Sequence, residues 1–237
     1  MSNHESEELI VTKGLRKVYT ENGVPVEAVR GIDLTIRRGE FLAIVGPSGS
    51  GKTTFLNLIS GLDHPTSGEV WLAGQELSAM SGRELSDFRR DRIGFIFQAY
   101  NLIPVLTVEE NVEYIMLLQG VEKEQRHRRV LEMLAEVGLE GYEDRVPPKL
   151  SGGQQQRVAV ARAMVSKPAM ILADEPTANL DSVTGAGLLD MMKELNGRSG
   201  MTFVFSTHDQ KIMERAERLV TLQDGEVHSD ESRPAGS

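Results

Sequence analysis

The chain of 237 residues contains no cysteine. Disulfide scaffolds, thiol catalysis and cysteine-ligated zinc are therefore excluded. Aromatic residues make up only 5%, and 26 Lys and Arg face 35 Asp and Glu, which gives a formal charge of −9. A strongly basic nucleic-acid-binding protein is thus not expected, and nucleic acid is not a predicted partner. The 40% of hydrophobic residues suffice for a sizeable core, so we expect one domain over residues 1–237.

The sequence also lacks a long apolar segment. No run approaches the roughly 20 residues that cross a bilayer. Residues 1–8 are polar and acidic, without the basic and apolar parts of a secretory signal. We therefore expect any membrane role to come through a partner protein. The polar residues 229–237 are expected to fray.

Short apolar runs alternate with amphipathic segments along the chain. A loose pattern predicts a strand at 29–36 after a turn at Asn22–Gly23. Residues 219–227 are typical of a hairpin. A helix between the predicted strands at 169–173 and 202–205 is expected to stop at Gly197. Strands that alternate with helices predict a mostly parallel α/β sheet, with chemistry at the carboxyl ends of its strands. The other predicted strands lie at 9–11, 40–45, 70–72, 169–173 and 202–205.

A helical pattern replaces this alternation from about residue 99 to about residue 165. Thr107 and Glu110 have the spacing of a capping box, so a helix is expected directly behind them. The charged segment 123–137 carries an apolar stripe and is closed by Gly138. We therefore predict a helical subdomain inserted in the α/β core at about 99–165.

A glycine-rich loop follows the strand at 40–45. Residues 46–53 match G-x-x-x-x-G-K-[ST] in full, between a buried strand and a predicted helix. Backbone N–H groups of such a loop converge on a polyphosphate at a helix N-terminus. Lys52 would neutralise β- and γ-phosphate oxygens, and Thr53 would hold Mg²⁺ through its hydroxyl. The candidate nucleotide-binding residues of this segment are Gly46, Pro47, Ser48, Gly49, Ser50, Gly51, Lys52, Thr53 and Thr54.

Two carboxylates follow the strand at 169–173. At the exit of a buried strand, Asp174 and Glu175 are costly unless they meet a cation. Asp174 suits the outer side of a Mg²⁺ site, and Glu175 suits a general base that activates an attacking water. Alone, this pair is more typical of an ordinary loop start; beside a phosphate-binding loop it predicts a hydrolytic site.

A second anion-binding candidate precedes the helical run at 155–165. Ser151, Gly152, Gly153 and Gln154 would present free backbone N–H groups at a helix start, although a simple helix cap is the alternative. The two phosphate-binding candidates lie about a hundred residues apart. The sequence leaves open whether both meet one nucleotide in one chain or across two chains.

The stretch Leu150–Gln154 is the unaltered signature of ATP-binding cassette (ABC) proteins, and from about residue 9 to about residue 227 the chain resembles the ATP-binding subunit of an ABC transporter. The resemblance implies a P-loop NTPase core with a mostly parallel sheet, an N-terminal antiparallel β part and a helical subdomain. It implies ATP and Mg²⁺ as cofactors, ATP hydrolysis, and a homodimer with ATP at the interface. It also implies an integral membrane (permease) subunit as partner, at the cytoplasmic face of the inner or plasma membrane.

The resemblance assigns roles to further residues. Tyr19 would stack on adenine, with a half-buried strand aromatic as the alternative. Gln98 would be a Mg²⁺ ligand and sense the γ-phosphate, His208 would contact the γ-phosphate, and residues 178–181 would line the dimer interface. The expected catalytic residues are Glu175, His208 and Lys52, and the expected Mg²⁺ ligands are Thr53, Gln98 and Asp174.

Residues 63–68 and 94–104 resemble the LolD/MacB/FtsE group, whose members serve lipoprotein release, macrolide or peptide export, and cell division. The alternative function is that of a regulatory or non-transport ABC ATPase, of the cell-division or the iron–sulfur assembly type. A P-loop kinase or small GTPase is disfavoured by residues 151–154 and by His208.

An apolar cluster just after Gln98 is predicted to receive a cytoplasmic helix or loop of the membrane subunit. Packing inside the helical subdomain is the alternative for any one of its members. The cluster comprises Phe97, Tyr100, Leu102, Ile103 and Val105.

Overall fold

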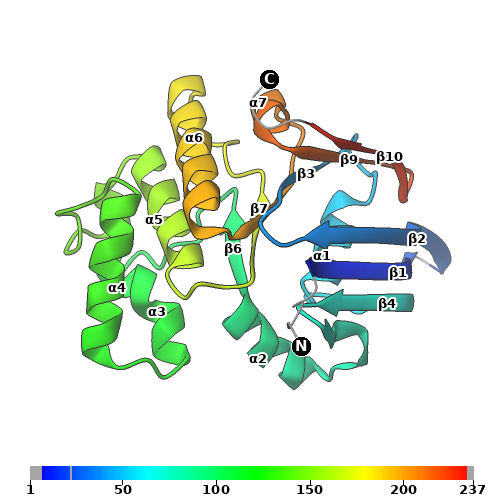
Figure 1. Cartoon of the computed structure of the whole chain (residues 1–237), viewed down its shortest axis with the longest axis horizontal. Helices are drawn as coiled ribbons and strands as arrows, with labels where there is room; N and C mark the ends of the chain where they lie inside the picture. Colours follow the sequence, from blue (N-terminus) through cyan, green and yellow to red (C-terminus); the bar gives the residue numbers. More distant parts are fainter. Residues whose placement is uncertain (1–6, 22, 234–237) are drawn as a thin grey trace, which may run out of the picture. The chain divides into compact units, whose positions relative to one another are not determined.

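The computed structural model of the chain describes residues 7–21 and 23–233. The described residues form two compact units, shown with their elements labelled in Figure 1. The first unit lies within Met1–Arg89 and Thr202–Ser237, and the second is Arg90–Met201. Asn22, half of the turn expected at Asn22–Gly23, lies outside the described residues.

An antiparallel sheet forms one part of the first unit. Its strands are β1 (Glu8–Glu21), β2 (Val24–Arg37), β4 (Ser67–Leu72) and β5 (Gln75–Glu76), in the order β2-β1-β4-β5. The strands expected at 9–11 and 29–36 extend to fourteen residues each, because β1 and β2 pair from Glu8–Arg37 to Glu21–Val24. Pairing thus supplies order where the hydrophobic pattern alone is weak. The expected N-terminal antiparallel β part is confirmed.

A second sheet of this unit carries the strands of the α/β core. It contains β3 (Phe41–Val45), β8 (Thr202–Ser206), β9 (Arg218–Gln223) and β10 (Glu226–Ser232). β3 pairs in parallel with both β8 and β9, and β10 pairs antiparallel with β9. All five residues of β3 are buried, as expected of a central parallel strand covered on both faces.

The C-terminal hairpin differs from the expectation at one end. Residues 229–232, expected to fray, belong to β10 and pair with β9. The Ser229 hydroxyl donates a hydrogen bond of 3.1 Å to the Thr221 hydroxyl across the two strands. This pairing compensates for the polar composition of the segment, which on its own gave no strand signal.

The helices of the first unit are α1 (Lys52–Ile59), η1 (Leu77–Ala79), α7 (Gln210–Arg215) and α2 (Gly82–Arg92), which leads out of the unit. α1 buries Phe55, Leu56, Leu58 and Ile59, and Gly61 follows its C-terminal end in the left-handed region at φ 65°. α2 was not anticipated, because only Leu85 and Phe88 are buried in an otherwise polar helix.

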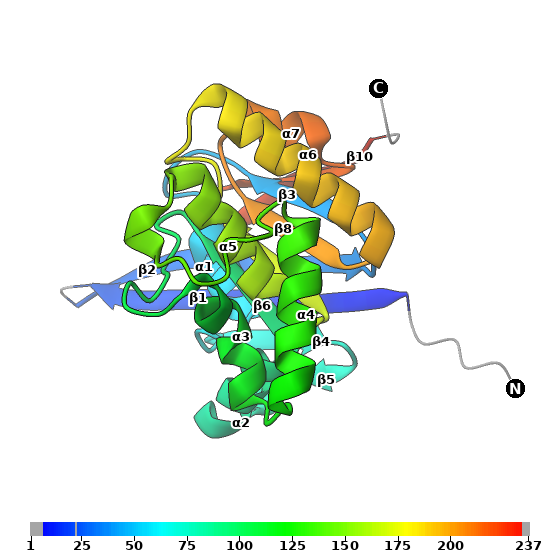
Figure 2. The same cartoon turned by 90° about the vertical axis from the view of Figure 1, so that its left-hand side faces the viewer.

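The second unit combines a parallel strand pair with helices. β6 (Ile93–Phe97) and β7 (Met170–Asp174) are parallel, and every regular element within residues 99–165 is helical. α3, α4 and α5 pack against one another (Figure 2). The helices are α3 (Val108–Leu118), α4 (Lys123–Glu136), η2 (Pro147–Lys149), α5 (Gly152–Met164) and α6 (Ser182–Ser199).

Helix ends show where local signals suffice and where they do not. The capping box at Thr107 is confirmed: its hydroxyl accepts from the Glu110 N–H, and the Glu110 carboxylate accepts from the Thr107 N–H. The stop expected at Gly197 is wrong, since α6 continues to Ser199 and Gly200 closes it at φ 67°. A helix tolerates an interior glycine at a cost of about 1 kcal/mol. Among the described residues, no helix is both long and apolar enough to cross a bilayer.

Candidate nucleotide-binding site

The glycine-rich loop connects β3 to α1 through a very close backbone path. Gly46 has φ 148° and Gly51 has φ 96°, values that favour glycine. A Cβ on Gly46 would lie 2.1 Å from the carbonyl oxygen of Leu222, and one on Gly51 would lie 2.4 Å from that of Ala28. Both positions therefore exclude a side chain, and the loop leads directly into the N-terminus of α1.

The polar groups of this loop fit a triphosphate. The Lys52 ammonium donates hydrogen bonds of 2.7 and 2.9 Å to the carbonyls of Gly46 and Pro47, so the cation lies over the loop. Ser50 is 2% exposed, and its hydroxyl has no hydrogen-bond partner among the described residues. The first turn of α1 contains no acidic residue. A cation and a helix N-terminus without a competing carboxylate favour an anion.

Tyr19 is held through its hydroxyl. On β1 it donates a hydrogen bond of 2.8 Å to the Asp63 carboxylate, which also pairs with Lys17 at 2.6 Å. Burial raises the pKa of Tyr19, and the hydrogen bond to Asp63 raises it further. The Lys17 ammonium lies 4.9 Å from the centre of the Tyr19 ring. Tyr19 is half-buried, as the strand-aromatic alternative predicts, and stacking on adenine stays a prediction.

His208 leaves the sheet beside the glycine-rich loop. β3 and β8 are parallel with Ile44 opposite Ser206, and the Thr207 N–H donates to the Ile44 carbonyl at 3.2 Å. The loop after β3 and the exposed His208 after β8 therefore start from the same carboxyl edge of the sheet. The first unit thus holds the candidate phosphate-binding loop and the His208 imidazole on adjacent strand ends.

A corresponding edge exists in the second unit. Phe97 on β6 is the register partner of Asp174 on β7, so Gln98 and Glu175 follow directly at the same edge. Glu175 has φ 45°, in the left-handed region that non-glycine residues rarely adopt. Such strain is concentrated at functional sites, where it fixes the direction of a side chain. The structure thus brings Gln98, Asp174 and Glu175 together.

Two further side chains hold this edge in place: Asn179, from the segment 178–181, and Gln156, which the sequence did not single out. The Asn179 side-chain amide donates a hydrogen bond of 2.9 Å to the Gln98 carbonyl. Gln156, fully buried on α5, donates one of 2.7 Å to the Pro176 carbonyl. The only sequence signal for Gln156 is a polar residue among apolar positions of a helix, which does not reveal its partner.

The segment Ser151–Gln154 forms the first turn of α5. This helix begins at Gly152, three residues before the expected start, because Ser151 and Gln154 form a reciprocal capping box. N–H groups of a first turn have no acceptor within the helix, and this turn contains no acidic residue. A Cβ on Gly153 would lie 2.4 Å from Cγ2 of Thr184 on α6, so close packing requires glycine there.

The apolar cluster after Gln98 is only partly a surface. Phe97, Tyr100, Leu102 and Ile103 are half-buried, whereas Val105 is 81% exposed. The buried side chain of Asn111 accepts from the Ile103 N–H and donates to the carbonyls of Ile103, Leu106 and Thr107. This bonding holds the loop in shape and leaves Val105 projecting from it.

The candidate residues are divided between the units. Tyr19, residues 46–54 and His208 belong to the first, and the remaining candidates to the second. Thr53, Gln98 and Asp174 offer a hydroxyl, an amide oxygen and a carboxylate. Mg²⁺ typically takes few protein oxygens and completes its octahedron with water and phosphate, so this donor set fits a metal that arrives with a nucleotide. Among the described residues, no three His, Asp or Glu side chains gather into a metal site.

Comparison with known proteins extends over nearly the whole chain. The sequence profile of a family described as ABC transporter matches residues 29–178. The uncharacterized ABC transporter ATP-binding protein MJ0796 of Methanocaldococcus jannaschii is 44% identical over 227 residues, which cover 94% of this chain and 97% of that protein. The macrolide export ATP-binding/permease protein MacB of Agrobacterium fabrum is 42% identical over 226 residues, which cover 95% of this chain and 35% of MacB.

The solved structures that this chain resembles are also described as ATP-binding cassettes or as parts of ABC transporters. The dimeric structure of a post-hydrolysis state of the ATP-binding cassette MJ0796, bound to ADP and Pi, has a TM-score of 0.86 at 43% identity and covers 96% of this chain and 100% of that chain. The structure of cbiO1 from Clostridium perfringens, part of the ABC transporter complex cbiONQ, has a TM-score of 0.87 at 26% identity and covers 96% of this chain and 89% of that chain.

Proposed function

Because this chain belongs to the ABC transporter family, we propose that it is the ATP-binding and hydrolysing subunit of an exporter of the LolD/MacB/FtsE-like group. It acts as a pair of copies with ATP between them and drives an integral membrane subunit from the cytoplasmic face of the membrane. One observation carries the proposal: α1 begins directly after Gly51, α5 begins with Gly152 and Gly153, and neither helix has an acidic residue in its first turn.

Charge explains how ATP joins two copies. A helix N-terminus carries roughly half a positive charge, and the Lys52 ammonium adds to it at α1. A triphosphate bound by the loop at residues 46–53 of one copy still exposes oxygens that attract Ser151–Gln154 of the other. ATP then holds the pair together. MJ0796, at 43% identity, is described as dimeric in a state bound to ADP and Pi, which supports this arrangement.

Hydrolysis is assigned to the edge that carries Glu175. The carboxylate of Glu175 takes a proton from a water molecule while the oxygen of that water forms a bond to the γ-phosphorus. The bond from that phosphorus to the β,γ-bridging oxygen breaks, and ADP leaves with the electron pair. Lys52 stabilises the charge that grows on this oxygen, and Gln98 and His208 bind γ-phosphate oxygens. Mg²⁺, held by Thr53, Gln98 and Asp174, supplies further neutralisation of the phosphates when bound.

Hydrolysis weakens the pair because it removes the γ-phosphate. ATP holds the two copies together only to the extent that it binds the paired state more tightly than the separated state. When the γ-phosphate is lost, Gln98 moves, and this movement is passed to the loop that follows Gln98. The exposed Val105 of this loop contacts the membrane subunit.

Replacing Glu175 by Gln tests the assignment. The amide accepts no proton, so hydrolysis should slow by roughly 10²–10⁴-fold while ATP affinity is kept, and a dimer should accumulate with Mg-ATP. Phosphate release and light scattering on a sizing column measure both, with the exposed Glu132→Gln on α4 as control. A Glu175→Gln variant that stays monomeric with Mg-ATP, or turns over at the wild-type rate, contradicts the proposal.

The exposed Val105 tests the membrane partner. In complexes with a four-span membrane subunit of the exporter type, Val105→Asp should abolish the stimulation of ATP hydrolysis by the partner, because an aspartate opposes apolar docking. The basal rate and the melting temperature should not change. Val24→Asp, at the 62% exposed Val24 on β2, is the control. Unchanged stimulation in Val105→Asp excludes this loop as the docking site.

A further inference from the structure

The turn between β9 and β10 lies directly against the glycine-rich loop at residues 46–53, called the phosphate loop below. Gly225, in this turn, donates a hydrogen bond of 3.1 Å from its N–H to the Ser50 carbonyl. Its own carbonyl accepts one of 2.8 Å from the Arg30 N–H on β2. A single buried residue thus connects the loop, the hairpin and β2.

This junction has no spare room. A Cβ on Gly225 would lie 2.9 Å from the Ala28 carbonyl oxygen, the same atom that lies 2.4 Å from the Cβ position of Gly51. At the other end of the loop, the Leu222 carbonyl on β9 lies 2.1 Å from the Cβ position of Gly46. The hairpin therefore contacts both ends of the loop that is expected to enclose the phosphates.

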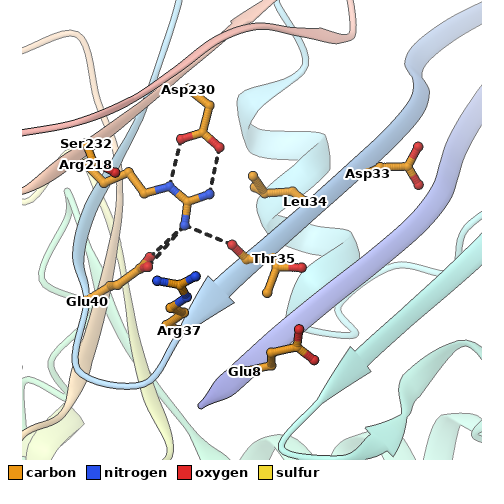
Figure 3. Close-up of a pocket in the computed structure, with 9 residues that line it drawn as sticks. All are labelled: Glu8, Asp33, Leu34, Thr35, Arg37, Glu40, Arg218, Asp230 and Ser232. Atoms are coloured by element: carbon orange, nitrogen blue, oxygen red, sulfur yellow. Dashed lines mark hydrogen bonds and ion pairs between the residues drawn. The ribbon is translucent and has the colours of Figure 1, made fainter. Parts of the chain in front are cut away.

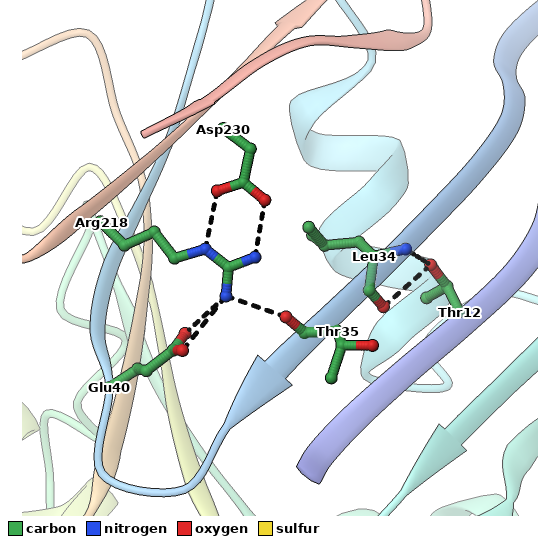
Figure 4. A network of polar contacts seen from close by, with 6 residues as sticks. All are labelled: Thr12, Leu34, Thr35, Glu40, Arg218 and Asp230. Carbon is green, nitrogen blue, oxygen red and sulfur yellow. Dashed lines mark hydrogen bonds and ion pairs between the residues drawn. The ribbon is translucent and has the colours of Figure 1, made fainter. Parts of the chain in front are cut away.

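The base of the hairpin is fixed as well. Arg218, the first residue of β9, makes two parallel hydrogen bonds of 2.7 Å to the Asp230 carboxylate on β10 (Figure 4). Its third nitrogen donates to the Thr35 carbonyl on β2 at 2.9 Å and to the Glu40 carboxylate at 3.0 and 3.1 Å. The hydrogen bonds to Asp230, opposed by burial and reinforced by the charge of Glu40, raise the pKa of Arg218.

The arginine reaches across a polar cavity of about 480 Å³, with Asp230 and Glu40 on either side of its guanidinium (Figure 3). Bidentate carboxylate–guanidinium pairs fix geometry as well as distance. The hairpin is thus joined to β2 at both ends, through Arg30 at the turn and Thr35 at the base.

We propose that the β9–β10 hairpin sets the shape of the phosphate loop, with Gly225 as a positioning residue that does not itself touch the nucleotide. The inference rests on the proposed function of the loop. Leu222 behind Gly46 and Gly225 beside Gly51 fix the separation of these two loop residues, and hence the direction of the backbone N–H groups between them. A shift of the turn by a few tenths of an ångström disturbs phosphate binding without changing any group that contacts ATP.

Gly225→Ala tests this against a closely matched control. Asp224 and Gly225 have φ 50° and 83°, and Ala73 and Gly74, in the β4–β5 turn, have φ 50° and 77°. A Cβ on Gly74 meets nothing within 4 Å. Both alanine variants therefore carry similar backbone strain, and only Gly225→Ala presses on the junction with the loop.

The expected result separates positioning from stability. Measured well below the melting temperature, Gly225→Ala should raise the Kd and KM for ATP about tenfold, or about 1.4 kcal/mol, with kcat within about twofold. Gly74→Ala should lower the melting temperature similarly and leave Kd unchanged. Equal Kd values for wild type and Gly225→Ala overturn the inference. A wild-type chain that does not bind ATP overturns instead the proposed function.

Arg218 supplies a second variant should Gly225→Ala not yield folded protein. Arg218→Met should raise KM for ATP severalfold, and Arg218→Lys should raise it less, because an ammonium keeps the charge but not the bidentate bond. Arg126→Met is the control, since Arg126 is similarly buried and pairs with Glu113 in the second unit. Equal KM values for Arg218→Met and Arg126→Met would contradict the role of the hairpin in shaping the phosphate loop.

Discussion

Phe97 and Asp174 are register partners on the parallel strands β6 and β7. The residue after each is a candidate for γ-phosphate chemistry, Gln98 in one strand and Glu175 in the other. The Asn179 amide, which donates to the Gln98 carbonyl at 2.9 Å, holds the segment after β7 against the segment after β6. Under the proposed function, a change at the phosphate would reach both Glu175 and the loop after Gln98 through this one edge of the sheet.

Gly153→Ala is expected to act through one methyl group. Its Cβ would lie 2.4 Å from Cγ2 of Thr184, so α5 and α6 must separate. The free energy of unfolding, measured by urea titration, should fall by about 1–3 kcal/mol, the usual cost of overpacking. ATP hydrolysis should fall with it.

Removing the obstructing methyl should reverse the loss. Thr184→Ser lacks Cγ2 but keeps the hydroxyl that donates to Asp181 at 2.6 Å. The double variant Gly153→Ala/Thr184→Ser should regain most of the stability, and Thr184→Ser alone should behave like wild type. Failure of the double variant to recover shows that Gly153 is required for a reason other than its packing on α6.

Tyr19→Ala tests base stacking. Loss of an aromatic platform typically costs about 1–3 kcal/mol of binding, or roughly 5- to 150-fold in Kd. Tyr19→Phe should keep most of the affinity, because the ring remains while the hydrogen bond to Asp63 is lost. Fluorescence titration with an ATP analogue measures both, with Tyr114→Ala on α3 as control. An unchanged Kd in Tyr19→Ala establishes the strand-aromatic role instead.

Asp63 predicts a pH dependence of stability. Burial raises its pKa, but hydrogen bonds from Lys17 and Tyr19 outweigh burial and hold the pKa of Asp63 below its usual range. A carboxyl group with a lower pKa in the folded state adds stability above its unfolded pKa and loses it as the pH falls through the folded pKa. Asp63→Asn should therefore be destabilising at pH 7 in urea titrations, and the difference should shrink below about pH 4. A difference that grows on acidification contradicts this origin.

Local signals in the sequence predict much of the fold because each signal acts within a few residues. The run of apolar residues at β3, the capping box at Thr107 and the hairpin at Asp224–Gly225 all depend on neighbours along the chain. β10 and the full lengths of β1 and β2 depend on pairing with distant strands, which the local pattern does not contain. Gly197 and Gly200 look alike in the sequence, and tertiary context decides which of them ends α6.

The candidate site also divides into parts that local sequence signals predict and parts that depend on contacts between distant residues. Its motifs are contiguous, so the loop at residues 46–53 and the turn at Ser151–Gln154 are visible in the sequence. Their supports are not contiguous. The contact of Gly225 with Ser50, and that of Gln156 with Pro176, join residues far apart in the chain through backbone atoms. Backbone acceptors carry no side-chain signature, so only the structure reveals them.

Cross-linking tests the bridging of two copies by ATP most directly. Since the chain has no cysteine, Ser48→Cys in one copy and Ser151→Cys in another are the only thiols present. With both in a Glu175→Gln background, a short bis-maleimide should link Ser48→Cys to Ser151→Cys with Mg-ATP and not with ADP. Absence of this link with Mg-ATP, or links only between like variants, would contradict a pair in which the nucleotide joins the loop of one copy to the α5 turn of the other.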